Sequence, residues 1–67
     1  MDIRWQVGRN LSKFRKDKGL TQEELAFDCE LDRTYISGIE RGIRNPTVLI
    51  LQRIAAALKI APSKLLE

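Results

Sequence analysis

The chain has 67 residues, of which 43% are hydrophobic and 31% charged, and its formal net charge is +3. This length suffices for one compact domain and leaves no room for a second module or a deep catalytic cleft. No apolar run approaches the roughly 20 residues of a membrane span, and the N-terminus lacks the apolar stretch of a secretory signal, so we expect a cytoplasmic protein. One cysteine and no histidine exclude an internal disulfide and a zinc site of ordinary ligand count, and no cofactor or small-molecule ligand is expected.

The charge is unevenly distributed along the chain. Residues 1–20 carry six Lys or Arg against two Asp or Glu, residues 21–40 carry one against six, and residues 41–67 carry five against one. Some acids of the middle third have a local role, because they fall in the first turn of a predicted helix, where the helix dipole favours negative charge. Arg33 is the only basic side chain of that third, which makes its position more informative than the total charge.

Helical periodicity covers nearly the whole sequence, without the alternation typical of strands. The first predicted helix spans about residues 2–17, and Gly19 supplies its C-terminal stop. The second opens at Thr21, which is expected to form a capping box with Glu24, and ends near Cys29.

The third predicted helix opens at Asp32, a favourable N-cap, and ends at Gly42. Only Glu30 and Leu31 remain for the turn that precedes it. Two short helices joined by such a tight turn predict a DNA-binding helix-turn-helix at about residues 21–42.

Two further helices are predicted in the last third. One follows Pro46 with Thr47 as its cap, and Pro62 suits the first position of a short last helix. The buried stripe of the fourth helix is expected to contain Leu51, Ile54, Ala55 and Leu58. The predicted fold class is therefore all-α, a compact bundle of about five helices.

The third helix has an apolar and a polar face. Ile36 and Ile39 are expected to anchor it to the core. The other face then shows Arg33 near the helix start, the end that this motif directs toward base edges in the major groove. Thr34 and Ser37 lie on the same face.

Two segments of this region resemble the helix-turn-helix of phage-repressor-type (Cro/CI, XRE) regulators. They are residues 21–26, Thr-Gln-Glu-Glu-Leu-Ala, and 31–42, Leu-Asp-Arg-Thr-Tyr-Ile-Ser-Gly-Ile-Glu-Arg-Gly. The likeness continues through residues 44–46 and the fourth helix. Within the family, residues 31–41 are similar to the controller proteins of restriction-modification systems. The resemblance implies a lambda-repressor-like domain that binds double-stranded DNA and regulates transcription.

The resemblance also implies roles for individual residues. The expected base contacts are Arg33, Thr34 and Ser37, with a guanidinium able to donate twice to guanine. The expected phosphate contacts are Gln22, Tyr35, Arg41, Arg44 and Asn45, and the alternative for each is an ordinary solvated side chain, or, for Tyr35, a ring packed on the first helix. Arg15 and Glu40 match an arginine and a glutamate that pair between the first and third helices.

Two residues depart from the family pattern. Glu30 occupies a turn position usually given to glycine, so the turn must avoid a positive φ there or carry modest strain. Gly38 lies inside the recognition helix, where it costs roughly 0.5–1 kcal/mol relative to alanine. Close approach to DNA or to a neighbouring helix would explain it.

A homodimer is expected, because a small core gains from a partner and one recognition helix contacts few base pairs. Its operator would contain inverted half-sites about 34 Å apart. We place the interface in the C-terminal segment, residues 58–67, with packing against the first helix as the alternative; the residues concerned are Ile60, Leu65 and Leu66. Two other classes of protein are alternatives to a DNA-binding regulator. The lack of histidine and of a glycine-rich phosphate loop argues against an enzyme. The other is an antitoxin-like module that binds a toxin.

Overall fold

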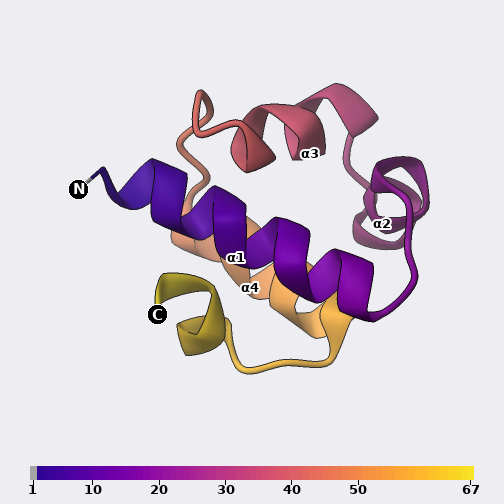
Figure 1. Cartoon of the computed structure of the whole chain (residues 1–67). Helices are drawn as coiled ribbons and strands as arrows, with labels where there is room; N and C mark the ends of the chain where they lie inside the picture. The colour runs from indigo at the N-terminus through magenta and orange to yellow at the C-terminus, as the bar shows by residue number, and fades with distance from the viewer. Residues whose placement is uncertain (1) are drawn as a thin grey trace.

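The computed structural model describes residues 2–67, in which four α-helices are followed by a short 3-10 helix and no strand occurs. The elements are α1 (Ile3–Asp17), α2 (Gln22–Cys29), α3 (Arg33–Glu40), α4 (Val48–Leu58) and η1 (Pro62–Leu66) (Figure 1). None of the helices in this part of the chain has the length and apolarity needed to cross a membrane.

The all-helical class and the element order are as predicted, but the count of about five helices needs a correction. The last element begins at Pro62 as expected, yet it is a 3-10 helix of 5 residues. The backbone N–H of Lys64 donates to the carbonyl of Ala61, three residues back, at 2.9 Å. Such short segments commonly close i to i+3 bonds instead of starting an α-helical ladder.

The helix starts are fixed by polar side chains at the predicted positions. The Thr21 hydroxyl accepts from the Glu24 N–H at 3.0 Å, and the Glu24 carboxylate accepts from the Thr21 N–H at 2.8 Å, which completes the capping box. Asp32 caps α3 through the Thr34 N–H at 2.8 Å, and Thr47 caps α4. Each such cap is worth about 0.5–2 kcal/mol, so local sequence chemistry sets these boundaries.

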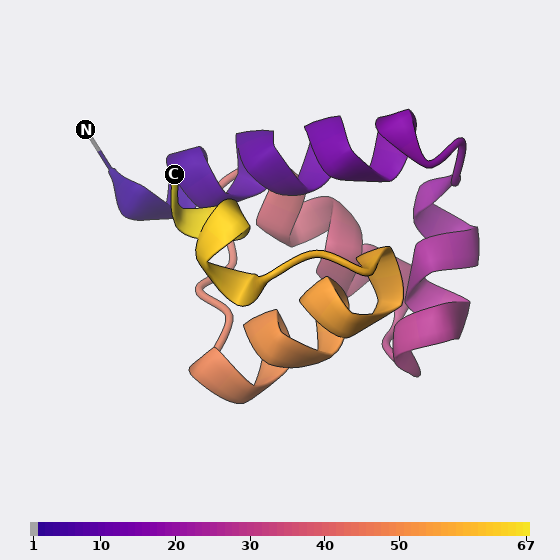
Figure 2. The same ribbon diagram turned by 90° about the horizontal axis from the view of Figure 1, so that it is seen from below.

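The core lies where α1, α3, α4 and η1 face one another, with α2 closing one side. Figure 2 shows η1 seated between α1 and α4, and α2 at the end of the molecule opposite the two termini. Of the stripe predicted for α4, Leu51 is half-buried and the other three residues are buried. The largest fully buried side chains come from all five elements: Leu11, Leu25, Cys29, Ile36, Ile39, Ile54, Leu58 and Leu65.

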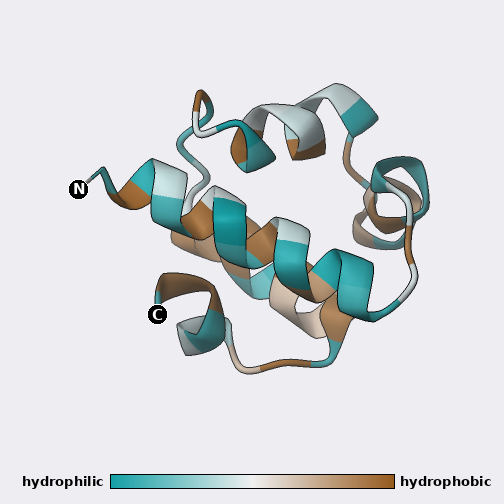
Figure 3. Cartoon of the chain, in the orientation of Figure 1, coloured by the Kyte–Doolittle hydropathy of each residue, from teal (hydrophilic) through white to brown (hydrophobic). Residues whose placement is uncertain are grey.

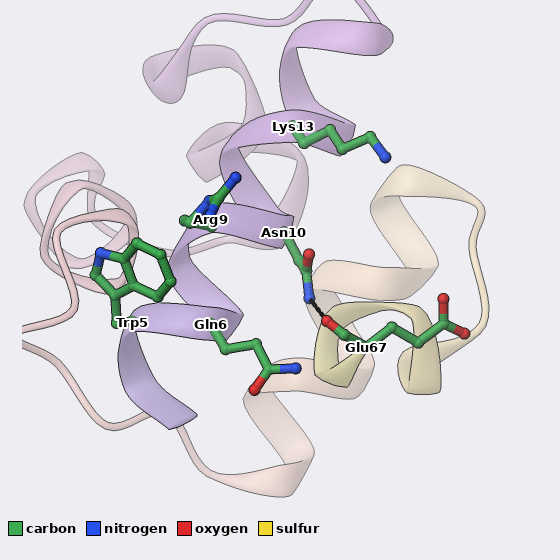
Figure 4. Close-up of a pocket in the computed structure, with 6 residues that line it drawn as sticks. All are labelled: Trp5, Gln6, Arg9, Asn10, Lys13 and Glu67. Carbon is green, nitrogen blue, oxygen red and sulfur yellow. Dashed lines mark hydrogen bonds between the residues drawn. The ribbon is translucent and has the colours of Figure 1, made fainter. Parts of the chain in front are cut away.

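The C-terminal residues pack against α1, which corrects one of the predicted interface residues. Leu65 is 0% exposed in the single chain, so its side chain cannot also contact a second subunit. Asn10 donates to the carbonyl oxygen of Glu67 at 2.9 Å (Figure 4). It also donates to that of Leu65 at 2.9 Å, and Gln6 donates to that of Leu66 at 3.0 Å. The alternative, packing on the first helix, therefore holds for Leu65.

Candidate nucleic-acid interface

The turn between α2 and α3 carries backbone strain at its first residue. Glu30 has φ 59° and ψ 41°, in the left-handed region that glycine adopts more easily. The next residue, Leu31, donates its N–H to the Ala26 carbonyl at 2.9 Å, which turns the chain back toward the core. Of the two possibilities left by the sequence, the structure has the strained turn.

The exposed face of α3 begins at its first residue. Arg33 and Thr34 are exposed and Ser37 is half-buried, whereas Ile36 and Ile39 on the opposite face are 0% exposed. Helix α3 is thus held by one face and open along the other, as expected for a recognition helix.

Thr34 is tied to the cap of α3. Its hydroxyl donates to an Asp32 carboxylate oxygen at 2.6 Å, and its N–H donates to the same oxygen. These bonds, the side-chain bond first, lower the pKa of Asp32 below its ordinary value, so the cap is ionised at neutral pH. With its hydroxyl proton directed at Asp32, Thr34 has its methyl group available for an apolar contact.

Arg44 folds back over α3 at Gly38. A Cβ at position 38 would collide with the aliphatic part of the Arg44 side chain, and the Arg44 N–H donates to the Gly38 carbonyl at 3.2 Å. The guanidinium lies 5.8 Å from the centroid of the Tyr35 ring, and that ring is half-buried against the core. Gly38 is therefore explained by room for Arg44, a reason that the sequence did not suggest.

The Arg15–Glu40 pair joins α1 to the end of α3. Arg15 Nε lies 2.6 Å from Glu40 Oε2, and a second bond of 3.0 Å runs from Nη2 to Oε1. The hydrogen bonds to Glu40, with a smaller contribution from the negative charge of its carboxylate, raise the pKa of Arg15 further above its ordinary value, against the opposing effect of burial. Arg15 also donates to the Leu20 carbonyl at 2.7 Å, and Gln22 donates its amide to Glu40 at 3.1 Å.

Gln22 and Arg33 face a shared shallow hollow between the starts of α2 and α3, which Arg15, Thr21 and Glu23 also line. The Gln22 side chain is half-buried and its amide donates to Glu40. The Glu24 N–H is taken up by the capping box, so the backbone N–H groups of Gln22 and Glu23 are the donors that the start of α2 offers to a ligand. Arg41, Arg44 and Asn45, at and beyond the end of α3, are exposed. The eight predicted DNA contacts therefore lie along α3, at the start of α2 and in the chain that follows α3.

Gly8 is a structural residue that the sequence reasoning missed. A Cβ there would collide with the carbonyl oxygen of Ile39 and come within 2.8 Å of that of Glu40, because α1 crosses the end of α3 at this point. Its signal was an isolated glycine inside a helical pattern, which often marks a close approach of two backbones.

Cys29 is a core residue. It is 1% exposed, and burial, with a smaller effect of Asp28, raises the pKa of its thiol to about 11. Reactive cysteines have the opposite environment, with partial exposure and a lowered pKa. Among residues 2–67, no group of three or more His, Cys, Asp or Glu is placed to hold a metal ion.

Comparison with known proteins places this geometry in a defined class. A family model described as Helix-turn-helix matches residues 11–65. The chain belongs to this family, and it is a helix-turn-helix transcriptional regulator of the XRE type.

Within the family, the chain is close to controller proteins of restriction-modification systems. It is 43% identical over 67 residues to the control protein C.BamHI of Bacillus amyloliquefaciens, covering 98% of this chain and 83% of that protein. It is 46% identical over 65 residues to the control protein C.MunI of a Mycoplasma species, covering 96% and 88%. The crystal structure of the controller protein C.AhdI of Aeromonas hydrophila superposes with a TM-score of 0.90 at 44% identity, covering 92% of this chain and 94% of that one.

Proposed function

We propose that the protein binds an inverted-repeat operator in double-stranded DNA as a homodimer and reads its sequence with the start of α3. The observation that carries this proposal is the position of Arg33 and Thr34, exposed at the first turn of a helix whose opposite face is fully buried. In this motif the N-terminal residues of the recognition helix contact base edges.

The two side chains suit different base edges. The Arg33 guanidinium can donate two parallel hydrogen bonds to O6 and N7 of a guanine. Thr34 supplies its methyl group to a thymine methyl, because its hydroxyl proton is directed at Asp32. Ser37 is half-buried and short, so it contributes at most a contact at the edge of the groove, directly or through water.

The proposed phosphate contacts flank Arg33 and Thr34 on both sides. Arg41, Arg44 and Asn45 are exposed beyond the end of α3, and at the other end the backbone N–H groups at the start of α2, near Gln22, can donate to a phosphate oxygen. Tyr35 supports this role mainly by carrying Arg44 across its ring. These contacts fix the position of the protein on DNA and carry little sequence information.

The biological role that we propose is control of a restriction-modification system. It rests on the similarity to three control or controller proteins over nearly the whole chain. The antitoxin-like alternative has no observation in its favour, because the related proteins are regulators.

Selection of bound sequences from a random duplex pool tests this proposal. We expect enrichment of a two-fold symmetric site with at least one guanine in each half-site and half-sites about one helical turn apart. Enrichment of no sequence, or of a site without symmetry, would overturn it. A matched selection with Arg33→Ala is expected to lose the guanine preference while symmetric spacing persists.

A further inference from the structure

The outward side of α1 carries a row of basic side chains. Arg9, Lys13 and Lys16 are exposed and follow one another at spacings of four and three residues, so they lie along one side of the helix. Figure 3 shows strongly hydrophilic stretches on α1. None of the three ion pairs found among residues 2–67 involves these side chains. Their charges are therefore available to a ligand.

Trp5 extends this row by one further helical turn. It is the only tryptophan of the chain and is 45% exposed. The Arg9 guanidinium lies 4.8 Å from the centroid of its ring, a cation–π contact that holds both side chains in place. Less side-chain entropy is then lost when a partner binds, and Trp and Arg are the residue types that most often dominate the binding energy of protein interfaces. We call Trp5, Arg9, Lys13 and Lys16 the basic face.

A shallow hollow opens on the basic face. It is lined by Trp5, Gln6, Arg9, Asn10, Lys13 and Glu67 (Figure 4). Gln6 and Asn10 are fixed by hydrogen bonds to carbonyl oxygens at residues 65–67. The one carboxylate of the lining, that of Glu67, lies 3.6 Å from Lys64 and is partly balanced there. The hollow therefore offers an exposed ring beside two unpaired positive charges.

The basic face is separate from the proposed DNA contacts, which lie on α3, at the start of α2 and in the chain after α3. Gly8 marks the side of α1 that is turned to α3, because a Cβ there would meet the carbonyl oxygens of Ile39 and Glu40. With 3.6 residues per turn, Arg9 and Lys13 lie about 100° and 140° around the helix from Gly8. A ligand on the basic face and DNA on α3 can therefore bind the same molecule.

We propose that the basic face binds an acidic segment of another protein, with carboxylates at Arg9 and Lys13 and an apolar side chain against Trp5. This inference goes beyond the proposed DNA binding and does not depend on it. Charge complementarity carries it, since a guanidinium and an ammonium both form charge-assisted hydrogen bonds with carboxylates. Duplex DNA would match the charges, but its bases are stacked inside the helix and its backbone presents a row of phosphates, which leaves Trp5 without an apolar partner.

The acidic side of α2 in a second copy of the chain is not the partner that we propose. Glu23, Glu24 and Asp28 are exposed there. A contact of α1 with α2 joins two unlike faces, so each copy would keep one face free for the next copy. Unless the rotation between copies closes a ring, such a contact extends into an open filament. A different protein avoids this outcome.

The test measures binding of a defined acidic peptide to the full chain without DNA. The probe is a fluorescein-labelled helical peptide of about 16 residues, with glutamates along one face and a leucine among them; the control peptide has glutamine in place of every glutamate. Fluorescence anisotropy at low salt should show saturable binding of the acidic peptide below about 500 µM and at least about tenfold weaker binding of the control. Because the chain has one tryptophan, a change in Trp5 emission with unlabelled peptide locates the site.

Variants of exposed residues test the two charges. Lys13→Gln should raise the dissociation constant of the acidic peptide about threefold, and Arg9→Gln/Lys13→Gln about tenfold, the range of exposed ion pairs. Lys59→Gln is the matched control: it removes the same charge from an exposed residue at the end of α4 and should leave the constant unchanged. Melting followed by circular dichroism should show the same fold in all three variants.

Four results would overturn the inference. They are no saturable binding, equal binding of the two peptides, unchanged Trp5 emission, and a double variant that binds within twofold of the wild type. It also fails if a duplex without the operator changes Trp5 emission and the double variant abolishes that change, because the face is then a DNA contact. Arg33→Ala should bind the peptide as the wild type does, so failure of the DNA proposal and failure of this inference are distinguishable.

Discussion

Replacing Glu40 with Ala perturbs the contact that holds the end of α3 to α1. The ion pair it forms with Arg15 has a 2.6 Å bond, and the two side chains are only 7% and 10% exposed. In Glu40→Ala the guanidinium keeps its bond to the Leu20 carbonyl but loses its carboxylate. Leaving one partner of a buried pair uncompensated costs about 3–5 kcal/mol.

That cost is large for a chain of this length. Small domains are stable by about 0.05–0.15 kcal/mol per residue, which gives roughly 3–10 kcal/mol here. Urea unfolding followed by far-UV circular dichroism should therefore show Glu40→Ala to be partly or largely unfolded even without denaturant. Lys64→Ala is the control: it removes a pair whose charges are 3.6 Å apart and more than half exposed, and should change stability by no more than about 0.5 kcal/mol.

The double variant Arg15→Met/Glu40→Leu distinguishes the free-energy cost of an unpaired buried charge from the cost of lost packing. Because it leaves no buried charge, it should be much less destabilised than the sum of the two single variants. Its residual cost includes the Gln22 amide, which loses its acceptor. A cost below about 1 kcal/mol for Glu40→Ala, or single effects of Arg15→Met and Glu40→Leu that simply add in the double variant, would show that an unpaired buried charge is not the cause.

Backbone geometry gives two further predictions, both measurable by urea unfolding. Glu30→Gly should stabilise the protein by up to about 1 kcal/mol, because glycine relieves the left-handed strain, whereas Glu30→Ala should give no gain; equal results would show that φ is not the cause. Gly8→Ala should destabilise by about 1–3 kcal/mol, because its Cβ meets carbonyl oxygens of α3 that are held by the helix. Gly38→Ala meets only the exposed Arg44 side chain, so it should keep most of its stability and weaken DNA binding instead; equal destabilisation by both would contradict this distinction.

Features set by neighbouring residues could be predicted from the sequence. The capping box of Thr21 and Glu24 and the caps at Asp32 and Thr47 depend on side chains that reach their own backbone a few residues on, and all are present. The burial of Ile36 and Ile39 follows from helical periodicity. Helix α3 and its exposed start could therefore be placed without a structure.

Features that depend on where distant segments meet could not be predicted in the same way. Leu65 and Leu66 are adjacent apolar residues, yet one is fully buried and the other is 45% exposed, because η1 turns one side to α1 and α4. Gly8 and Gly38 depend on the crossing of α1 with α3 and on the return of Arg44. No local pattern in the sequence contains these contacts.

The central claim, that Arg33 reads a base while Arg44 holds the backbone, is tested most directly by measuring the affinities of both alanine variants on the selected operator and on its single-base variants. Arg33→Ala should weaken operator binding by about 1–3 kcal/mol and remove the penalty for replacing one guanine in each half-site. Arg44→Ala should weaken binding to all these sequences nearly equally and lower the salt dependence by about one phosphate contact for each copy of the chain. An Arg33→Ala variant that loses the same affinity on every sequence would contradict the account.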